Sequence, residues 1–182
     1  PDVRLGDHKH LSRRLIKGGN KSMVARELTD NSAAKLRELI ASATNNVDNT
    51  IYIRGLRLTP DLFDGIQTSA YKLSVMQEGA MTNIREMEQL GSSADKTMGD
   101  TDNFGMGSRT STLPWGDVCY ITRKDGVSSM LVLGMRQNKV KIIVPLSDVT
   151  KWVEDNASER IYPPGKDFTE VMLLGKDSDP SQ

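Results

Sequence analysis

Two short segments of this sequence carry groups that could hold Mg²⁺ and the phosphates of a nucleotide. Glu27 and Asn31 supply a carboxylate and an amide four residues apart, a spacing that puts both on one face of a helix. Oxygen ligands of these types suit Mg²⁺. Much later, the sequence Asn-Phe-Gly-Met-Gly-Ser from Asn103 to Ser108 supplies a glycine-rich turn, whose backbone N–H groups can approach phosphate oxygens closely. Together they predict a nucleotide site, although each alone also fits an ordinary solvated helix face or a tight turn.

The composition limits the classes of partner. A chain of 182 residues can bury one sizeable core, which predicts a single domain over 1–182. Lys plus Arg number 24 and Asp plus Glu also number 24, so a contact with nucleic acid would need a local basic patch that the net charge does not indicate. No apolar run approaches the roughly 20 residues of a membrane span, and we expect no membrane contact.

Cysteine usage indicates the compartment. Cys119 is the only cysteine, which excludes an internal disulfide and any zinc site built from several cysteines. It lies in an apolar run and is interpreted as a buried packing residue rather than a nucleophile. We therefore expect an intracellular protein, cytoplasmic by default, with the nucleus as an alternative. The start without Met and the abrupt end at Gln182 are interpreted as those of a fragment of a longer chain or of a processed chain.

A helix is expected to position Glu27 and Asn31. Apolar residues recur at multiples of four from Val24 to Ile40, which predicts a helix from Asn20 to about Ala43. A short β-rich run at 50–53 follows, and Thr59 before Pro60 predicts the start of another helix.

The next segment, 67–107, is rich in glycine and polar residues and has little apolar periodicity apart from one expected helix at 82–90. A segment of this length and composition is typical of a mobile lid or of a partly disordered segment.

The last third of the chain has the pattern of strands, at 117–123, 129–135, 140–144 and 170–174, with hairpin turns at 124–126 and 136–138. A short helix is expected at 147–155 with Ser147 as its N-cap. Helices first and strands last predict an α+β fold, a two-layer α/β sandwich with a mostly antiparallel sheet and helices on one face.

The order of these segments resembles the GHKL ATPases, a superfamily that includes gyrase B, the heat-shock chaperone ATPases, sensor histidine kinases, MutL and MORC proteins. The resemblance runs from about Ser22 to Gly175. It rests on Glu27-x-x-x-Asn31, on Phe-Gly-Met-Gly at 104–107, and on the closing strand entered at 168–173. It implies a Bergerat-type ATP-binding fold.

The resemblance also implies roles for single residues. Glu27 corresponds to the general base that activates the attacking water, and Asn31 to the residue that binds Mg²⁺. Thr169 matches a threonine that joins the hydrogen-bond network beneath adenine. On the phosphate side of ATP, the turn leads into a helix whose N–H groups face the phosphates, and a lid lysine lies near them; the matching residues are Lys96, Phe104, Gly105, Met106 and Gly107.

Two positions depart from the pattern of these ATPases. Ala34 stands where they carry an aspartate three residues after the asparagine. Their Asp-x-Gly-x-Gly segment aligns best with 53–57, so Gly55 keeps the first glycine while Ile53 replaces the aspartate that binds the adenine amino group. Asp48 is the nearest acidic residue. Three interpretations stay open: the base is read differently, residues outside this sequence carry the segment, or nucleotide binding has decayed.

Two functions follow. The first is a module that binds Mg–ATP, hydrolyses it slowly, and couples lid closure to dimerisation or to remodelling of a partner protein through regions outside this fragment. The second is a non-catalytic interaction domain that keeps the fold with degraded nucleotide binding. We favour the first because a domain without chemistry has no physical need to combine Glu27, Asn31 and the turn at 104–107.

Overall fold

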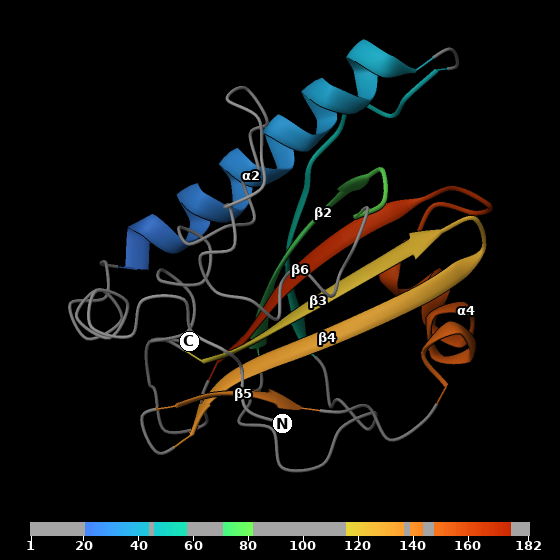
Figure 1. Ribbon diagram of the computed structural model, residues 1–182. Coiled ribbons are helices and arrows are strands. Elements are labelled where there is room, and N and C mark those ends of the chain that lie inside the picture. Colours follow the sequence, from blue (N-terminus) through green and yellow to red (C-terminus); the bar gives the residue numbers. More distant parts are fainter. Residues whose placement is uncertain are drawn as a thin grey trace.

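The computed structural model describes residues 21–43, 46–57, 71–81, 116–136, 139–143 and 148–175. Within these ranges the chain forms two helices and one antiparallel sheet of six strands, in the order β1-β2-β6-β3-β4-β5 (Figure 1). The elements are α2 (Lys21–Ser42), β1 (Tyr52–Arg57), β2 (Tyr71–Glu78), β3 (Asp117–Lys124), β4 (Val127–Arg136), β5 (Lys139–Ile143), α4 (Val149–Arg160) and β6 (Phe168–Gly175). The predicted α+β class, the first helix and the antiparallel sheet are confirmed. No helix in the described ranges is long and apolar enough to cross a membrane.

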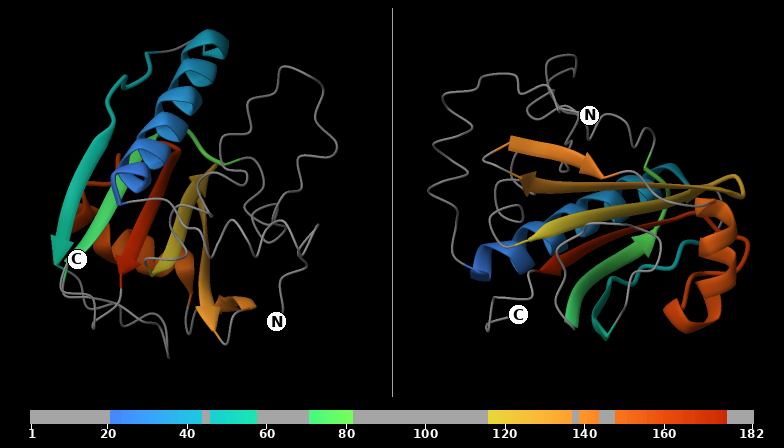
Figure 2. Two further views of the ribbon diagram at one scale, coloured as in Figure 1. Left: turned by 90° about the vertical axis from the view of Figure 1, so that its left-hand side faces the viewer. Right: turned by 90° about the horizontal axis from the view of Figure 1, so that it is seen from below.

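The two described helices lie on opposite faces of the sheet. Val153 of α4 packs in one core with Met76, Ile121 and other residues of that face. The neighbouring residue Gln77 points to the other face, since side chains alternate along a strand, and there it contacts Ser32 of α2. In Figure 1 the sheet runs between α2 and α4, and the left view of Figure 2 has α2 in front of it.

The expectation of helices on one face is therefore wrong for the described residues, which form three layers. The physical reason lies in β3, whose residues 117–123 are all buried, so that both of its faces are covered. A near-continuous apolar run is typical of a strand that is covered on both faces, and 118–121 is such a run.

Strand β2 lies within 67–107, the segment expected to be a lid. It pairs with β1 on one side and with β6 on the other. The lid interpretation is therefore wrong for 71–81, while 67–70 and 82–107 lie outside the described residues, as does the helix expected to start at Thr59. The sequence of β2 lacks a clear alternation of apolar and polar residues because two of its polar residues, Ser74 and Gln77, are buried.

The turn at 124–126 and the second described helix differ little from expectation, while residues 137–138 of the turn expected at 136–138 lie outside the described residues. Asp125 and Gly126 have φ values of 50° and 79°, the left-handed conformation of a tight hairpin turn, which confirms the turn at 124–126. Helix α4 begins at Val149 and is capped by Asp148, whose carboxylate accepts a hydrogen bond from the backbone N–H of Lys151 at 3.0 Å. The predicted cap, Ser147, is thus one residue too early.

A buried charged cluster, the Glu170 cluster, joins β1, β2, β6 and α4. Glu170 is fully buried, and its Oε2 accepts from Arg54 Nη2 at 3.1 Å and from Ser74 Oγ at 2.6 Å. Its Oε1 accepts from the Tyr162 hydroxyl at 2.8 Å and from Arg160 Nη2. Burial and the carboxylate of Glu170 raise the pKa of Tyr162 well above its ordinary value, so this hydroxyl keeps its proton. The cluster ties β6 to β1, β2 and α4 on one face of the sheet, and Thr169, the residue before Glu170, points to the opposite face.

Candidate functional site

Helix α2 presents Glu27 and Asn31 one turn apart. Asn31 is only 4 % exposed, whereas Glu27 is half-buried. The amide nitrogen Nδ2 of Asn31 has no hydrogen-bond partner in the part of the chain that the structure describes. A buried donor without an acceptor destabilises the protein that carries it, so this amide is suited to a ligand that supplies an oxygen. Rotation about χ2 would exchange the two ends of the amide and offer its oxygen instead.

A second buried amide lies next to α2. The hydroxyl of Ser32 donates to Oε1 of Gln77 at 2.9 Å, and Nε2 of Gln77 has no partner among the described residues. On the sheet Gln77 is the register partner of Thr169. The hydroxyl of Thr169 donates to the carbonyl oxygen of Gly79 at 2.6 Å. Polar groups from α2, β2 and β6 therefore gather at the end of β2.

Gly79 forms a tight turn where β2 ends. Its φ of 98° lies in the left-handed region, and a Cβ on it would lie 3.1 Å from Cδ2 of Leu39 on α2. Its N–H donates to the carbonyl oxygen of Asp167 at 3.0 Å. A side chain at this position would therefore meet both backbone strain and crowding against α2.

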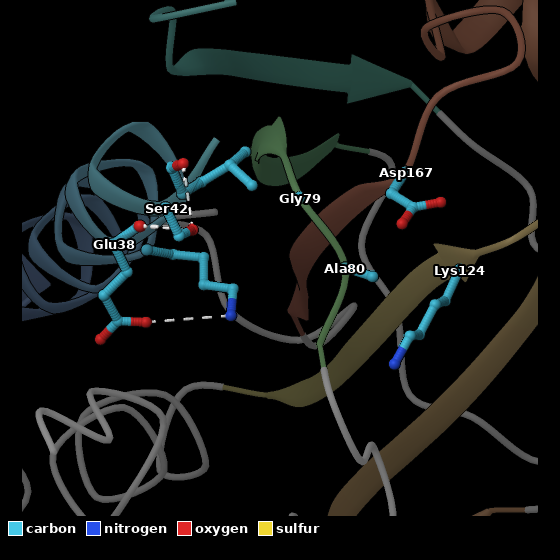
Figure 3. Close-up of a pocket in the computed structure, with 8 residues that line it drawn as sticks. Glu38, Ser42, Gly79, Ala80, Lys124 and Asp167 are labelled. Carbon is cyan, nitrogen blue, oxygen red and sulfur yellow. Dashed lines mark hydrogen bonds and ion pairs between the residues drawn. The ribbon is translucent and has the colours of Figure 1, made fainter. Parts of the chain in front are cut away.

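A pocket of about 310 Å³ opens beside this turn. In Figure 3, Glu38 and Ser42 lie on the α2 side, Lys124 and Asp167 lie opposite, and the Gly79 turn runs between them. Lys35, one helical turn after Asn31, also lines the pocket and is paired with Glu38 at 3.9 Å. The volume is at the lower end of the range for small-molecule sites.

Some of the predicted site residues lie near the Ser32–Gln77 contact and others do not. Thr169 lies beside Gln77 in the register of the sheet, Asn31 precedes Ser32 on α2, and Glu27 lies one turn before Asn31. Gly55 does not lie in a turn: it is an exposed residue inside β1, a strand at the edge of the described sheet, with nothing within 4 Å of where a Cβ would be. Its interpretation as the turn glycine of the site is therefore corrected.

The alternative acidic residue, Asp48, is exposed, and its carboxylate accepts a hydrogen bond from the hydroxyl of Tyr52 at 2.7 Å. It is therefore not a buried carboxylate that could bind the amino group of adenine. The residues predicted to contact phosphate lie outside the described ranges and stay predictions: Lys96, Phe104, Gly105, Met106 and Gly107.

Three residues of the site were missed from the sequence: Ser32, Gln77 and Gly79. The signal for Gly79 was present, because a glycine follows the run Leu73–Gln77 as it would follow any strand that ends in a turn. It was overlooked because β2 was not recognised as a strand. Within the described ranges no group of three or more His, Cys, Asp or Glu side chains could hold a metal ion. Mg²⁺ commonly binds proteins through only one or two side-chain oxygens together with phosphates.

Cys119 is buried on the α4 face of the sheet, as predicted. Burial and the charge of Glu170 raise the pKa of its thiol far above the ordinary value, so the reactive thiolate is not formed near neutral pH. We expect iodoacetamide at pH 8 to leave Cys119 unmodified in the folded protein and to alkylate it fully in denaturant, as measured by mass spectrometry. Rapid labelling of the folded protein would contradict this placement.

The sequence matches no protein-family model and no curated protein. The resemblance to the GHKL ATPases therefore rests on the residues of this chain alone, and its implications are developed as a proposal.

Proposed function

We propose that this chain is a nucleotide-binding module that binds Mg–ATP and hydrolyses it slowly. The observation that carries the proposal is the pair of buried amides, Asn31 and Gln77, whose nitrogen atoms have no partners among the described residues. Asn31 lies on α2, which also lines the pocket, and Gln77 lies near the end of β2, two residues before Gly79, which lines the pocket as well. A ligand with phosphate oxygens and a heterocyclic base could supply the missing acceptors.

The position of β2 supports a changed alignment with the GHKL pattern. β2 is the second strand, and Gln77-Glu78-Gly79-Ala80-Met81 stands where that pattern has Asp-x-Gly-x-Gly. Gln77 then takes the place of the aspartate, and Gly79 keeps the first glycine. Thr169 lies beside Gln77 in register, which suits the role that the resemblance implies for it beneath the base. We therefore assign Gln77 and Gly79, instead of Ile53 and Gly55, to the base side of the site.

The site residues lie along α2 in the order of the parts of a bound nucleotide: the base, then the phosphates, then the attacking water. Leu39 contacts the Gly79 turn on the base side, Asn31 lies two turns earlier, and Glu27 one turn before that. At 1.5 Å per residue, Glu27 and Leu39 are about 18 Å apart along the helix axis. In this proposal the base lies near Gly79, Asn31 contributes to holding Mg²⁺ at the phosphates, and Glu27 takes a proton from the attacking water. Mg²⁺ neutralises phosphate charge when bound.

A second function, a non-catalytic interaction domain, is favoured by Ala34 and by α4. Ala34 is buried in α2 where the related ATPases have an aspartate, and α4 covers a face of the sheet that the resemblance leaves uncovered. Both functions involve a second copy of the chain or a partner protein. In the nucleotide-binding module, lid closure would couple nucleotide binding to that contact.

Replacing Asn31 tests the Mg²⁺ role. We expect Asn31→Ala to weaken ATP binding in the presence of Mg²⁺ by about tenfold or more, since the variant loses a metal ligand. Without Mg²⁺ the loss should be smaller. Calorimetric titration of both proteins under both conditions measures this difference.

The matched control is Asn156→Ala on α4, where the amide donates to the carbonyl oxygen of Trp152 on the other side of the sheet. This variant should bind ATP as the parent does. The same affinity for Asn31→Ala and the parent in Mg²⁺ would refute the assigned role.

A further inference from the structure

We propose that Asp167 binds the exocyclic amino group of adenine, so that the site prefers a nucleotide whose base carries this group. This inference rests on the proposed function and deepens it. The observation behind it is the pocket beside Gly79, in which Asp167 lies on the side opposite α2 (Figure 3). Gln77, which takes the place of the aspartate of the GHKL pattern, is 1 % exposed and does not line this pocket.

The pocket is placed where the base is expected. Gly79 and Ala80 line it, and the N–H of Gly79 donates to the carbonyl oxygen of Asp167 at 3.0 Å, so the main chain of Asp167 lies directly against the turn. On the side of α2, Leu39 supplies an apolar surface on which a flat ring can pack. The volume of about 310 Å³ lies within the range of ligand pockets.

The carboxylate of Asp167 offers this pocket an acceptor. A carboxylate has no donor, so this property does not depend on how the side chain is turned. Its Oδ1 accepts a hydrogen bond from the backbone N–H of Asp125 at 2.9 Å, in the hairpin turn between β3 and β4. Within the described residues the carboxylate has no other hydrogen bond or ion pair, so Oδ2 can accept from a ligand. The amino group of adenine is such a donor.

The other charged groups of the pocket do not take this role. Glu38, the second carboxylate, is paired with Lys35 at 3.9 Å. Lys124 lies on the same side of the pocket as Asp167 and has no hydrogen bond or ion pair in the part of the chain that the structure describes (Figure 3). Its ammonium group is a donor, and the amino group of adenine stands next to ring nitrogens that accept. Asp167 and Lys124 together therefore complement a base that carries a donor and an acceptor side by side.

Asp167 gives a residue to one of the open interpretations, that the base is read differently. The resemblance implies an aspartate on the strand that precedes the turn, where this chain has Gln77. Asp167 reaches the same turn from the start of β6, through its contact with Gly79. The carboxylate that binds the base thus comes from another strand of the sheet.

The experiment compares ATP with purine riboside triphosphate, which differs from ATP only by the absence of the amino group. We expect the 182-residue chain, titrated by calorimetry in Mg²⁺, to bind ATP about tenfold or more tightly, because the analogue cannot donate to the charged acceptor.

Asp167→Asn tests the residue. The backbone N–H of Asp125 can only donate, so it holds the oxygen of the new amide and leaves the NH₂ group for the pocket. This group opposes the amino group of ATP but meets no donor at that position in the analogue. The affinity for ATP should fall to that for the analogue or below, while the analogue binds as it does to the parent. A residue with a structural role alone would weaken both nucleotides equally.

The matched control is Asp125→Asn. It removes a neighbouring exposed carboxylate and keeps the backbone N–H that contacts Asp167. Asparagine adopts the φ of 50° found there as readily as aspartate does. The preference for ATP should persist in this variant. Thermal unfolding shows whether each variant is folded, and the comparison in the parent protein does not depend on either.

Each outcome is decisive. Tighter binding of ATP by the parent, lost in Asp167→Asn and kept in Asp125→Asn, supports the inference. Equal affinities of the parent for the two nucleotides overturn it and leave the proposed function intact. A preference that persists in folded Asp167→Asn, or that Asp125→Asn loses as well, overturns the role of Asp167. Failure of both nucleotides to bind overturns the proposed function itself.

Discussion

Glu27→Gln should lower the rate of ATP hydrolysis by about 100-fold or more while leaving the affinity for ATP nearly unchanged. Glutamine keeps the shape of the side chain but cannot accept a proton from the attacking water. Glu27 is half-buried on α2, one turn before Asn31, so it can reach the phosphate side of a ligand held by Asn31. Steady-state release of phosphate and calorimetric titration, made on the same preparation, separate turnover from binding.

Asp30→Asn is the matched control. Asp30 lies three residues further along α2, is exposed, and contacts Arg26 at 3.4 Å on the solvent side. The loss of a carboxylate there should leave turnover as it is in the parent. If Glu27→Gln hydrolyses ATP at the parent rate in a preparation free of contaminating ATPases, Glu27 is not the general base.

The largest effect on stability is expected for Glu170→Gln. This change removes the one carboxylate of the Glu170 cluster and leaves the guanidinium groups of Arg54 and Arg160 without their counter-ion, in a region where Arg160 is 1 % exposed. Leaving a buried charge uncompensated costs about 3 to 5 kcal/mol of unfolding free energy. We expect the Tm to fall by roughly 10 °C in a chain of this size.

The control for charge loss is Glu154→Gln. Glu154 pairs with Nη1 of Arg123 at 3.0 Å, but its side chain is 55 % exposed, and Arg123 keeps the carbonyl oxygens of Pro163 and Lys166 as acceptors. Its loss should cost less than about 1 kcal/mol. Equal shifts in Tm for the two variants would show that the buried cluster adds nothing beyond an ordinary surface pair.

The sequence predicted those elements whose pattern is local. Helix α2 follows from apolar residues at multiples of four, and the hairpin between β3 and β4 follows from Asp125-Gly126, whose left-handed φ values need such residues. Strand β2 could not be found in this way. Its buried polar residues find partners far along the chain, Ser74 at Glu170 and Gln77 at Ser32, and no local pattern reports such pairs.

The candidate site was predictable to a similar extent. Glu27, Asn31 and Thr169 are predictable through the resemblance to the GHKL ATPases, because each stands where that pattern has a residue of the same type. Gln77 is not predictable in this way, because the pattern has an aspartate at its place and an amide in a strand carries no signal until its partners are known. The alignment with Gly55 fails because β2, and not β1, is the strand that precedes the turn at Gly79.

Calorimetric titration of the parent protein with ATP, with and without Mg²⁺, tests the central claim most directly. The proposed function predicts saturable binding at one site per chain, tighter when Mg²⁺ is present. Absence of binding in both conditions would contradict it and would favour the non-catalytic interaction domain.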